Sequence, residues 1–168
     1  RTHNILLYID PFTVDGVIWA KYDTVFRTLS DRTSIEILLN FNGPSFVRQG
    51  RAALASWNDD PDNIDSGDSV GAPIHHQIYS KKLSEIVGGD WWMPIVRDTS
   101  DFNATVKLIT TGFCDRLRSR FKEVCFHSLK EKTRHKVVKY SLIFASRSHH
   151  GLVLMNDEMA KSLKRFAD

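Results

Sequence analysis

The stretch "LLYIDPFTVDG", residues 6–16, decides the fold of this chain, because a run of apolar residues ends there abruptly in Asp-Pro-Phe. The run covers residues 5–9 and is made of β-branched, aliphatic and aromatic side chains. An unbroken apolar run of this length predicts a strand that is buried on both faces. Asp10-Pro11 ends the strand, since proline cannot donate to the hydrogen-bond ladder. We therefore expect residues 5–9 to form a central strand of a sheet.

The next segment of the chain predicts a βαβ unit. Apolar residues recur at helical spacing over residues 19–29, at Trp19, Tyr22, Phe26 and Leu29. A second apolar run, "IEILLNF", follows at residues 35–41. A strand, a helix and a strand joined by short links are typical of two parallel strands with a helical crossover.

The remainder of the chain predicts further helices and a hairpin. We expect helices over residues 45–54, capped by Ser45, over 76–87, from a cap at Thr99 or Ser100 to about residue 121, and over 156–166. Strands are expected at residues 124–129 and 137–147, joined as an antiparallel hairpin. Residues 56–73 are acidic and rich in turn-forming residues, and we expect a loop insertion there.

This order of elements indicates an α/β protein with a Rossmann-like half sheet, in which a parallel βαβ unit is followed by an antiparallel β-hairpin and flanked by helices. It is the order found in the second half of a class I methyltransferase sheet, where the last strand inserts antiparallel beside its neighbour. Order alone does not define a function.

The composition is that of a globular protein of one domain, residues 1–168. The chain is 42% hydrophobic and 26% charged, and its net charge of +3 is spread over interspersed acidic and basic residues. No apolar stretch approaches the ~18 residues that a membrane span needs. The two cysteines, Cys114 and Cys125, lie in apolar surroundings, and we expect them to be reduced and buried in a cytoplasmic protein.

Several stretches, in the same order, resemble the three-Cys-motif partner proteins (TcmP), a prokaryotic family with a methyltransferase-like fold. They are "LLYIDPFTVDGVIW", "TSIEILLNFNGPSFVR", "GGDWW", "FCDRLRSRF" and "KYSLIFASRSHHGLVLMND". The family's Asp-Pro-aromatic-Gly signature is similar to Asp10-Pro11-Phe12, although Thr13 replaces the glycine. Its Asn-Phe pair and following Arg match Asn40-Phe41 and Arg48, and its closing strand matches residues 144–146 and Gly151.

The resemblance implies a site for S-adenosylmethionine in an N-terminal half that precedes these residues in the family. No G-x-G pattern follows a strand in this chain. Because the first residue is Arg1 and a strand begins close to it, we expect the chain to be the C-terminal part of a longer protein. Either an N-terminal half or a second chain would then complete the sheet, and this chain alone would be inactive.

The candidate site lies beyond the carboxyl ends of the two parallel strands, where open α/β sheets bind ligands. Asp10 stands at the carboxyl end of the first strand, and Asn40 and Asn42 stand at the carboxyl end of the second. In amino-methyltransferases an acidic or amide residue, a proline and an aromatic residue hold the amino group of a flipped base. We assign Asp10, Pro11 and Phe12 as candidate catalytic residues, and Asn40, Asn42 and Arg48 as candidate substrate-binding residues.

Each of these residues also has an ordinary structural interpretation. Asp10 could cap a turn, and Phe12 could belong to the core. Asn40 could bond to a neighbouring loop, and Arg48 could be a solvated charge on a helix. The amino-methyltransferase pattern also has a second proline, which this chain lacks.

The best candidate for contact with nucleic acid is the basic segment that contains Lys132, Arg134 and Lys136. Such residues bind phosphates without reading sequence, and a charged hairpin loop is the alternative interpretation. The pairs His75-His76 and His149-His150 are poor chelates, since adjacent side chains diverge, and we expect no metal site. We interpret residues 149–151 as a turn after a strand.

Two functions remain open from the sequence. The complete protein could transfer a methyl group from S-adenosylmethionine, with a nucleobase as one possible acceptor. Alternatively, the chain could be a non-catalytic module that binds proteins or nucleic acid in a defence or mobile-element setting. A nuclease is a third option, but it lacks a convincing Asp/Glu/Lys cluster.

Overall fold

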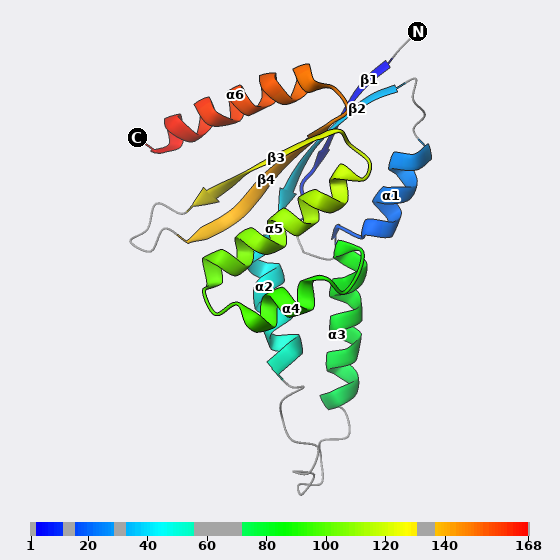
Figure 1. Cartoon of the computed structure of the whole chain (residues 1–168), viewed down its shortest axis with the longest axis vertical. Coiled ribbons are helices and arrows are strands. Elements are labelled where there is room, and N and C mark those ends of the chain that lie inside the picture. Colours follow the sequence, from blue (N-terminus) through cyan, green and yellow to red (C-terminus); the bar gives the residue numbers. More distant parts are fainter. Residues whose placement is uncertain (1–2, 12–15, 29–32, 56–71, 131–136, 168) are drawn as a thin grey trace, which may run out of the picture.

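A computed structural model describes residues 3–11, 16–28, 33–55, 72–130 and 137–167. It contains four strands and six helices in these ranges (Figure 1). Their bounds are β1 His3–Ile9, α1 Trp19–Thr28, β2 Thr33–Phe41, α2 Gly43–Ala55, α3 Ala72–Val87, α4 Trp92–Asp98, α5 Phe102–Arg118, β3 Glu123–Lys130, β4 Val138–Ser146 and α6 His149–Ala167.

The four strands form one mixed sheet with the order β1-β2-β4-β3. β1 is parallel to β2, with Ile5 beside Ile35, and β4 is antiparallel to both of its neighbours. The last strand is thus inserted between β2 and β3. The protein has the α/β Rossmann-like half sheet that the sequence predicts, with a parallel βαβ unit and an antiparallel hairpin.

Helices lie against both faces of this sheet, because alternate residues of each strand point to opposite sides. On one face, Phe41 of β2 stacks on Phe113 of α5 with ring centroids 4.9 Å apart, and Phe26 of α1 meets Phe121 edge to face. On the other face, α6 packs against β3 and β4, and its Gly151 lies next to Glu36 of β2. The helices α2, α3 and α4 gather beyond the carboxyl end of β2 (Figure 1).

β1 is an edge strand among the described residues, which contradicts the prediction of a strand buried on both faces in the centre of a sheet. Its side chains Leu6 and Tyr8 are 57% and 58% exposed, and Ile5 is 40% exposed. The apolar run correctly predicts the strand, but burial depends on neighbours that lie outside the run. α6 packs mainly against β3 and β4.

Other predicted boundaries also differ from the structure. α6 begins at His149, so residues 149–151 are its first turn and not a separate turn, and the helix starts seven residues before the predicted Asn156. Gly151 explains the early start, because a Cβ there would lie 2.2 Å from Glu36 Oε1. The absence of a side chain lets the first turn of the helix approach β2.

The helical region before β3 is divided differently from the prediction. α4 was not predicted, since its Pro94 suggests a break; proline is tolerated here because it lies in the first turn. α5 is capped by Asp101, whose Oδ1 accepts a hydrogen bond from the Ala104 backbone N–H, and not by Thr99 or Ser100. α3 begins at Ala72, so the expected loop 56–73 ends two residues early and otherwise lies outside the described residues.

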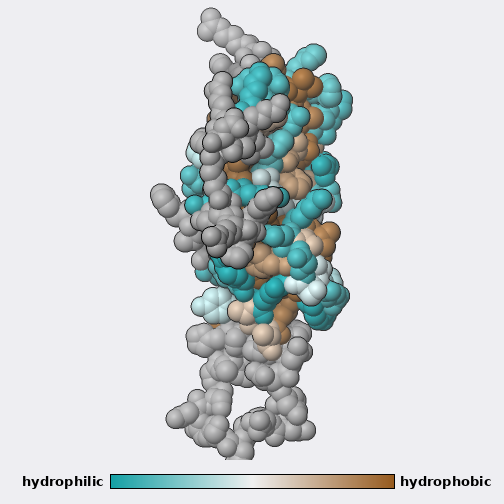
Figure 2. All heavy atoms as spheres, turned by 90° about the vertical axis from the view of Figure 1, so that its left-hand side faces the viewer, coloured by the Kyte–Doolittle hydropathy of each residue, from teal (hydrophilic) through white to brown (hydrophobic). Residues whose placement is uncertain are grey.

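The surface seen in Figure 2 is a mixture of hydrophilic and hydrophobic residues. Leu154 of α6 is 70% exposed, and its neighbour Val153 is 53% exposed. In the described part of the chain, no helix combines the length and the apolar character that crossing a membrane requires.

Candidate functional site

Asp10 and Asn40 meet at the carboxyl edge of the sheet. Asp10 directly follows β1, whose last residue Ile9 pairs with Leu39, so Asp10 comes to lie beside Asn40 of β2. The Asn40 Nδ2 group donates a hydrogen bond of 2.8 Å to Asp10 Oδ1. The predicted convergence of these two side chains is confirmed, and it follows from the parallel pairing of two strands that end at the same edge.

The Asn40–Asp10 pair leaves one buried oxygen atom without a partner in the described part of the chain. Asn40 Oδ1 is buried and accepts no hydrogen bond there. Asp10 is exposed, and its carboxylate also interacts with the side chain of Tyr8. A carboxylate is an acceptor only, so Asp10 can receive a hydrogen bond from an amino group while Asn40 holds its other oxygen in place.

Tyr8 is a further member of this site that the sequence interpretation missed. It lies two residues before Asp10 on the same face of β1. Partial desolvation raises the pKa of Tyr8 above its usual value, and the charge and hydrogen bonding of Asp10 raise it further, with a smaller contribution from Tyr140. The period-two alternation of β1 was the available signal, since it places positions 8 and 10 on one side.

Pro11 is half-buried, and Gly16 packs against it. A Cβ on Gly16 would lie 2.5 Å from the Pro11 Cβ atom, so only glycine permits this close approach. The hydroxyl of Tyr22 donates to the Gly16 carbonyl at 3.2 Å, which ties Gly16 to α1. Phe12, the third predicted residue of the motif, lies outside the described residues.

Asn42 caps the N-terminus of α2, a role that the sequence did not predict. Its Oδ1 atom accepts a hydrogen bond of 3.0 Å from the Ser45 backbone N–H, which makes Asn42 the N-cap of α2. The predicted cap, Ser45, is instead inside the helix, where its Oγ atom accepts a bond from Gln49 Nε2. The cap leaves Asn42 Nδ2 as the group available to a ligand.

Arg48 and the basic segment do not join the Asp10–Asn40 pair in the described structure. Arg48 lies exposed on α2, and no hydrogen bond or ion pair links it to another described residue. Lys132, Arg134 and Lys136 lie outside the described residues, as does most of the loop 56–73. The structure thus brings together Asp10 and Asn40, with Asn42 following at the end of the same strand.

In the described residues, no glycine-rich turn follows a strand. Asp-Pro follows β1, and a single glycine, Gly43, follows β2 at the start of α2. That glycine packs against the core, since a Cβ there would lie 3.1 Å from Val106 and 3.3 Å from Thr110. Gly88 and Gly89 follow a helix. The glycine-rich turn that receives a nucleotide after a strand is therefore missing from these ranges.

The two cysteines show no sign of catalytic activation. Burial raises the pKa of the Cys114 thiol to about 12, and it also raises the pKa of half-buried Cys125. A nucleophilic cysteine needs the opposite shift, since the thiolate is the reactive form. Both thiols are free, as predicted. The described residues also hold no cluster of three or more His, Cys, Asp or Glu side chains that could bind a metal.

Comparisons with protein families, with curated proteins and with solved structures give no significant match to this chain.

Proposed function

We propose that this chain is the acceptor-binding half of a methyltransferase-like enzyme related to the TcmP family, acting on an amino group of a nucleobase. In this proposal Asp10, Pro11 and Phe12 hold the acceptor, and Asn40 and Asn42 position it. Arg48, Lys132, Arg134 and Lys136 contact the phosphates of the nucleic acid. Residues 1–168 form one domain of a longer cytoplasmic protein.

The hydrogen bond between Asn40 and Asp10 carries this proposal. It holds a carboxylate at the carboxyl edge of the sheet, and the two oxygens of a carboxylate have about four lone-pair sites that can accept hydrogen bonds. An exocyclic amino group has two N–H donors, and Asp10 Oδ2 and a nearby carbonyl or amide oxygen are suitable acceptors for them. Asn40 Oδ1, buried and without a partner among the described residues, is one such amide oxygen.

The free edge of β1 supports the second part of the proposal, that the methyl donor is bound elsewhere. Seven residues of β1 have no strand on their outer side in the described structure, and the apolar side chains Leu6 and Tyr8 are exposed there. Natural sheets usually protect such an edge with charges, prolines or a covering element. An N-terminal half or a second chain that adds strands to β1 would protect it and supply the site for S-adenosylmethionine.

Calorimetry and a transfer assay on the complete protein test this function. We expect S-adenosylmethionine to bind, and Asp10→Ala to lower methyl transfer at least 100-fold while donor affinity changes less than about threefold. Asp98→Ala, which removes an exposed carboxylate on α4, is the matched control and should leave transfer unchanged.

Absence of donor binding at millimolar concentration would exclude the enzyme. Donor binding with full transfer in Asp10→Ala would exclude the assigned role of Asp10 and leave the acceptor site elsewhere.

The second candidate function is a non-catalytic interaction module, and the exposed edge of β1 is the observation that favours it. A partner that adds a strand there would use main-chain hydrogen bonds for affinity and the side chains Leu6 and Tyr8 for specificity. Leu6→Lys should then abolish binding of the partner while Asp10→Ala has no effect. For a methyltransferase, by contrast, Asp10→Ala should lower methyl transfer.

A further inference from the structure

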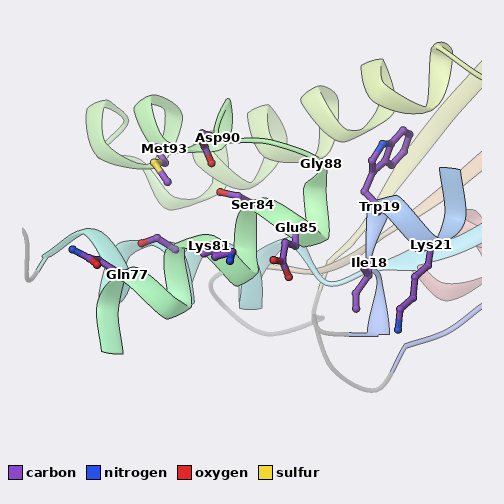
Figure 3. A pocket seen from close by; sticks show the side chains of 12 residues that line it. Ile18, Trp19, Lys21, Gln77, Lys81, Ser84, Glu85, Gly88, Asp90 and Met93 are labelled. Atoms are coloured by element: carbon purple, nitrogen blue, oxygen red, sulfur yellow. The ribbon is translucent and has the colours of Figure 1, made fainter. Parts of the chain in front are cut away.

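A pocket of about 780 Å³ lies beside the carboxyl edge, between the start of α1, one side of α3 and the start of α4. Figure 3 shows Ile18, just before α1, with Trp19 and Lys21 of α1, and the wall that runs from Gln77 of α3 to Gly88 just after that helix. This volume is within the usual range for sites that bind small molecules. None of the residues predicted from the sequence as site residues lines it.

The pocket lies off the N-terminal end of α1. Four consecutive residues, Ile18, Trp19, Ala20 and Lys21, line it. Ile18 precedes α1 and the other three residues form its first turn, so the N-terminal end of the helix is part of the pocket wall. The Lys21 and Tyr22 N–H groups bond to the Ile18 carbonyl at 3.0 and 3.3 Å, and the N–H groups before them, which have no partner within the helix, favour an anion.

Ser80 of α3 provides a second, independent sign of a ligand. Its side chain lines the pocket and is only 4% exposed, and its Oγ atom has no hydrogen-bond partner in the described structure. A buried hydroxyl without a partner costs free energy unless a ligand or water completes it. Its neighbour Ser84 differs, because its Oγ atom already accepts a bond of 3.0 Å from Trp92 Nε1.

The remaining side chains of the pocket separate into three chemical kinds. Lys21 and Lys81 are exposed cations, and Glu85 and Asp90 are exposed carboxylates; no described ion pair joins any of them to another residue. Trp19, Ile18 and Met93 supply an apolar surface, with Trp19 held edge to face by Phe113 at 5.9 Å. A ligand that satisfies all three has an anionic group, hydroxyl or amino donors, and a flat apolar ring.

We propose that this pocket binds one nucleotide unit, with its phosphate between the N-terminus of α1 and the two lysines. Ser80 then bonds to the sugar or the base, Glu85 or Asp90 accepts from sugar hydroxyls, and the base lies against Trp19 and Met93. The choice of ligand rests on the proposed function, because the pocket would hold a nucleotide that flanks the acceptor base.

The position of the pocket agrees with such a flanking site. Gly16 packs directly on Pro11, and Ile18 follows it by two residues, a reach of at most about 7 Å. The pocket therefore begins two residues along the chain from the glycine that packs on Pro11. A single strand of nucleic acid that places one base at Asp10 can place a neighbouring nucleotide here.

Calorimetric titration of the complete protein with nucleoside 5′-monophosphates, in the absence of any methyl donor, tests the proposal. Inorganic phosphate and the unphosphorylated nucleosides are the comparison ligands. We expect a monophosphate to bind with a Kd of about 1 mM or tighter, and at least tenfold more tightly than phosphate or nucleoside alone. Lys21→Gln and Lys81→Gln should each weaken it at least threefold, while the control Lys107→Gln on α5 should not.

Ser80→Ala separates ligand binding from folding. Removal of an unpartnered buried hydroxyl should leave the thermal stability unchanged or higher, yet weaken the monophosphate at least threefold. Unchanged affinity in Ser80→Ala, equal binding of inorganic phosphate, or no saturation by any monophosphate would each overturn the proposal.

Asp10→Ala keeps this test distinct from that of the proposed function. The variant should bind monophosphates as the unaltered protein does, even if it transfers no methyl group. Loss of monophosphate binding in Asp10→Ala would place the nucleotide at the sheet edge instead and overturn the assignment to the pocket.

Discussion

β1 and β2 are parallel, in register and similarly apolar, but they bury their side chains very differently. Ile35 of β2 is fully buried, whereas its register partner Ile5 of β1 is 40% exposed, although both point to the same face. Among the described strands, β2 has a neighbour on each side, and β1 has one neighbour only. The difference shows that an apolar strand acquires its core from its neighbours, and that β1 presents an apolar edge in this chain.

The largest predicted effect is a difference in stability between two variants that shorten an isoleucine, one in each strand. Ile35→Ala should lower the free energy of unfolding by about 2–5 kcal/mol, because it leaves a cavity in the core. Ile5→Ala, at the matched position of β1, should cost about 1 kcal/mol or less, since its side chain is partly in water. Denaturant unfolding of both variants measures the two values. Equal losses would mean that β1 is covered as fully as β2.

The edge of β1 predicts a smaller effect on association. Lysine on an exposed edge strand opposes pairing with another strand, because the charge would have to be desolvated. We expect Leu6→Lys to weaken self-association of this chain, or its binding to a strand-donating partner, at least tenfold, which corresponds to about 1.4 kcal/mol. Analytical ultracentrifugation measures this change.

Leu154→Lys on α6 is the control for that experiment, because Leu154 is even more exposed but lies away from the strand edge. It should leave association unchanged. An equal effect of both lysines would indicate a general loss of hydrophobic contact, and not pairing along β1.

The hydrogen bond between Asn40 and Asp10, at the carboxyl ends of the two strands, should contribute a smaller free energy. Asp10→Ala, Asn40→Ala and the double variant form a cycle around the 2.8 Å hydrogen bond. We expect a coupling energy of about 0.5–1.5 kcal/mol from unfolding measurements. A coupling energy near zero would show that the bond does not hold the two side chains together in solution.

The smallest effect concerns the ionisation of Tyr8. Its pKa is raised, so the folded protein holds this proton more tightly than the unfolded chain does. The stability that this provides is complete below the ordinary tyrosine pKa of about 10 and is lost as the pH rises through the folded value. Asp10→Asn should lower the Tyr8 pKa, which tyrosinate absorbance can follow.

Tyr22 of α1 is the internal control for this titration, because burial alone raises its pKa. Its titration should be the same in Asp10→Asn. A shift of both tyrosines would point to a general loosening of the fold.

Local patterns explain which parts of the fold were predictable. The apolar runs of β1 and β2, the helical spacing of α1 and the hairpin all follow from periodicity, and the structure confirms them. The caps were harder, since Asn42 and Asp101 compete with nearby serines and threonines of similar propensity. The start of α6 depends on the contact of Gly151 with Glu36, which are far apart in sequence.

The candidate site was also predictable only in part. Asp10 and Asn40 were expected to meet because both end parallel strands, and this rule needs only the βαβ order. Their register, the unpartnered oxygen of Asn40 and the part played by Tyr8 required the structure. The roles of these residues in catalysis remain proposals that the variants above can test.

The sequence by itself determined the α/β class, the βαβ unit and the placement of Asp10 at a strand end, because these depend on periodicity and on residues that break it. Only the tertiary structure decided that β1 lies at the sheet edge, that Asn42 caps α2, and that α1 and α3 enclose a pocket around Ser80. The reason is that burial, register and cavities arise between segments distant in the sequence, and no local pattern records which segments become neighbours.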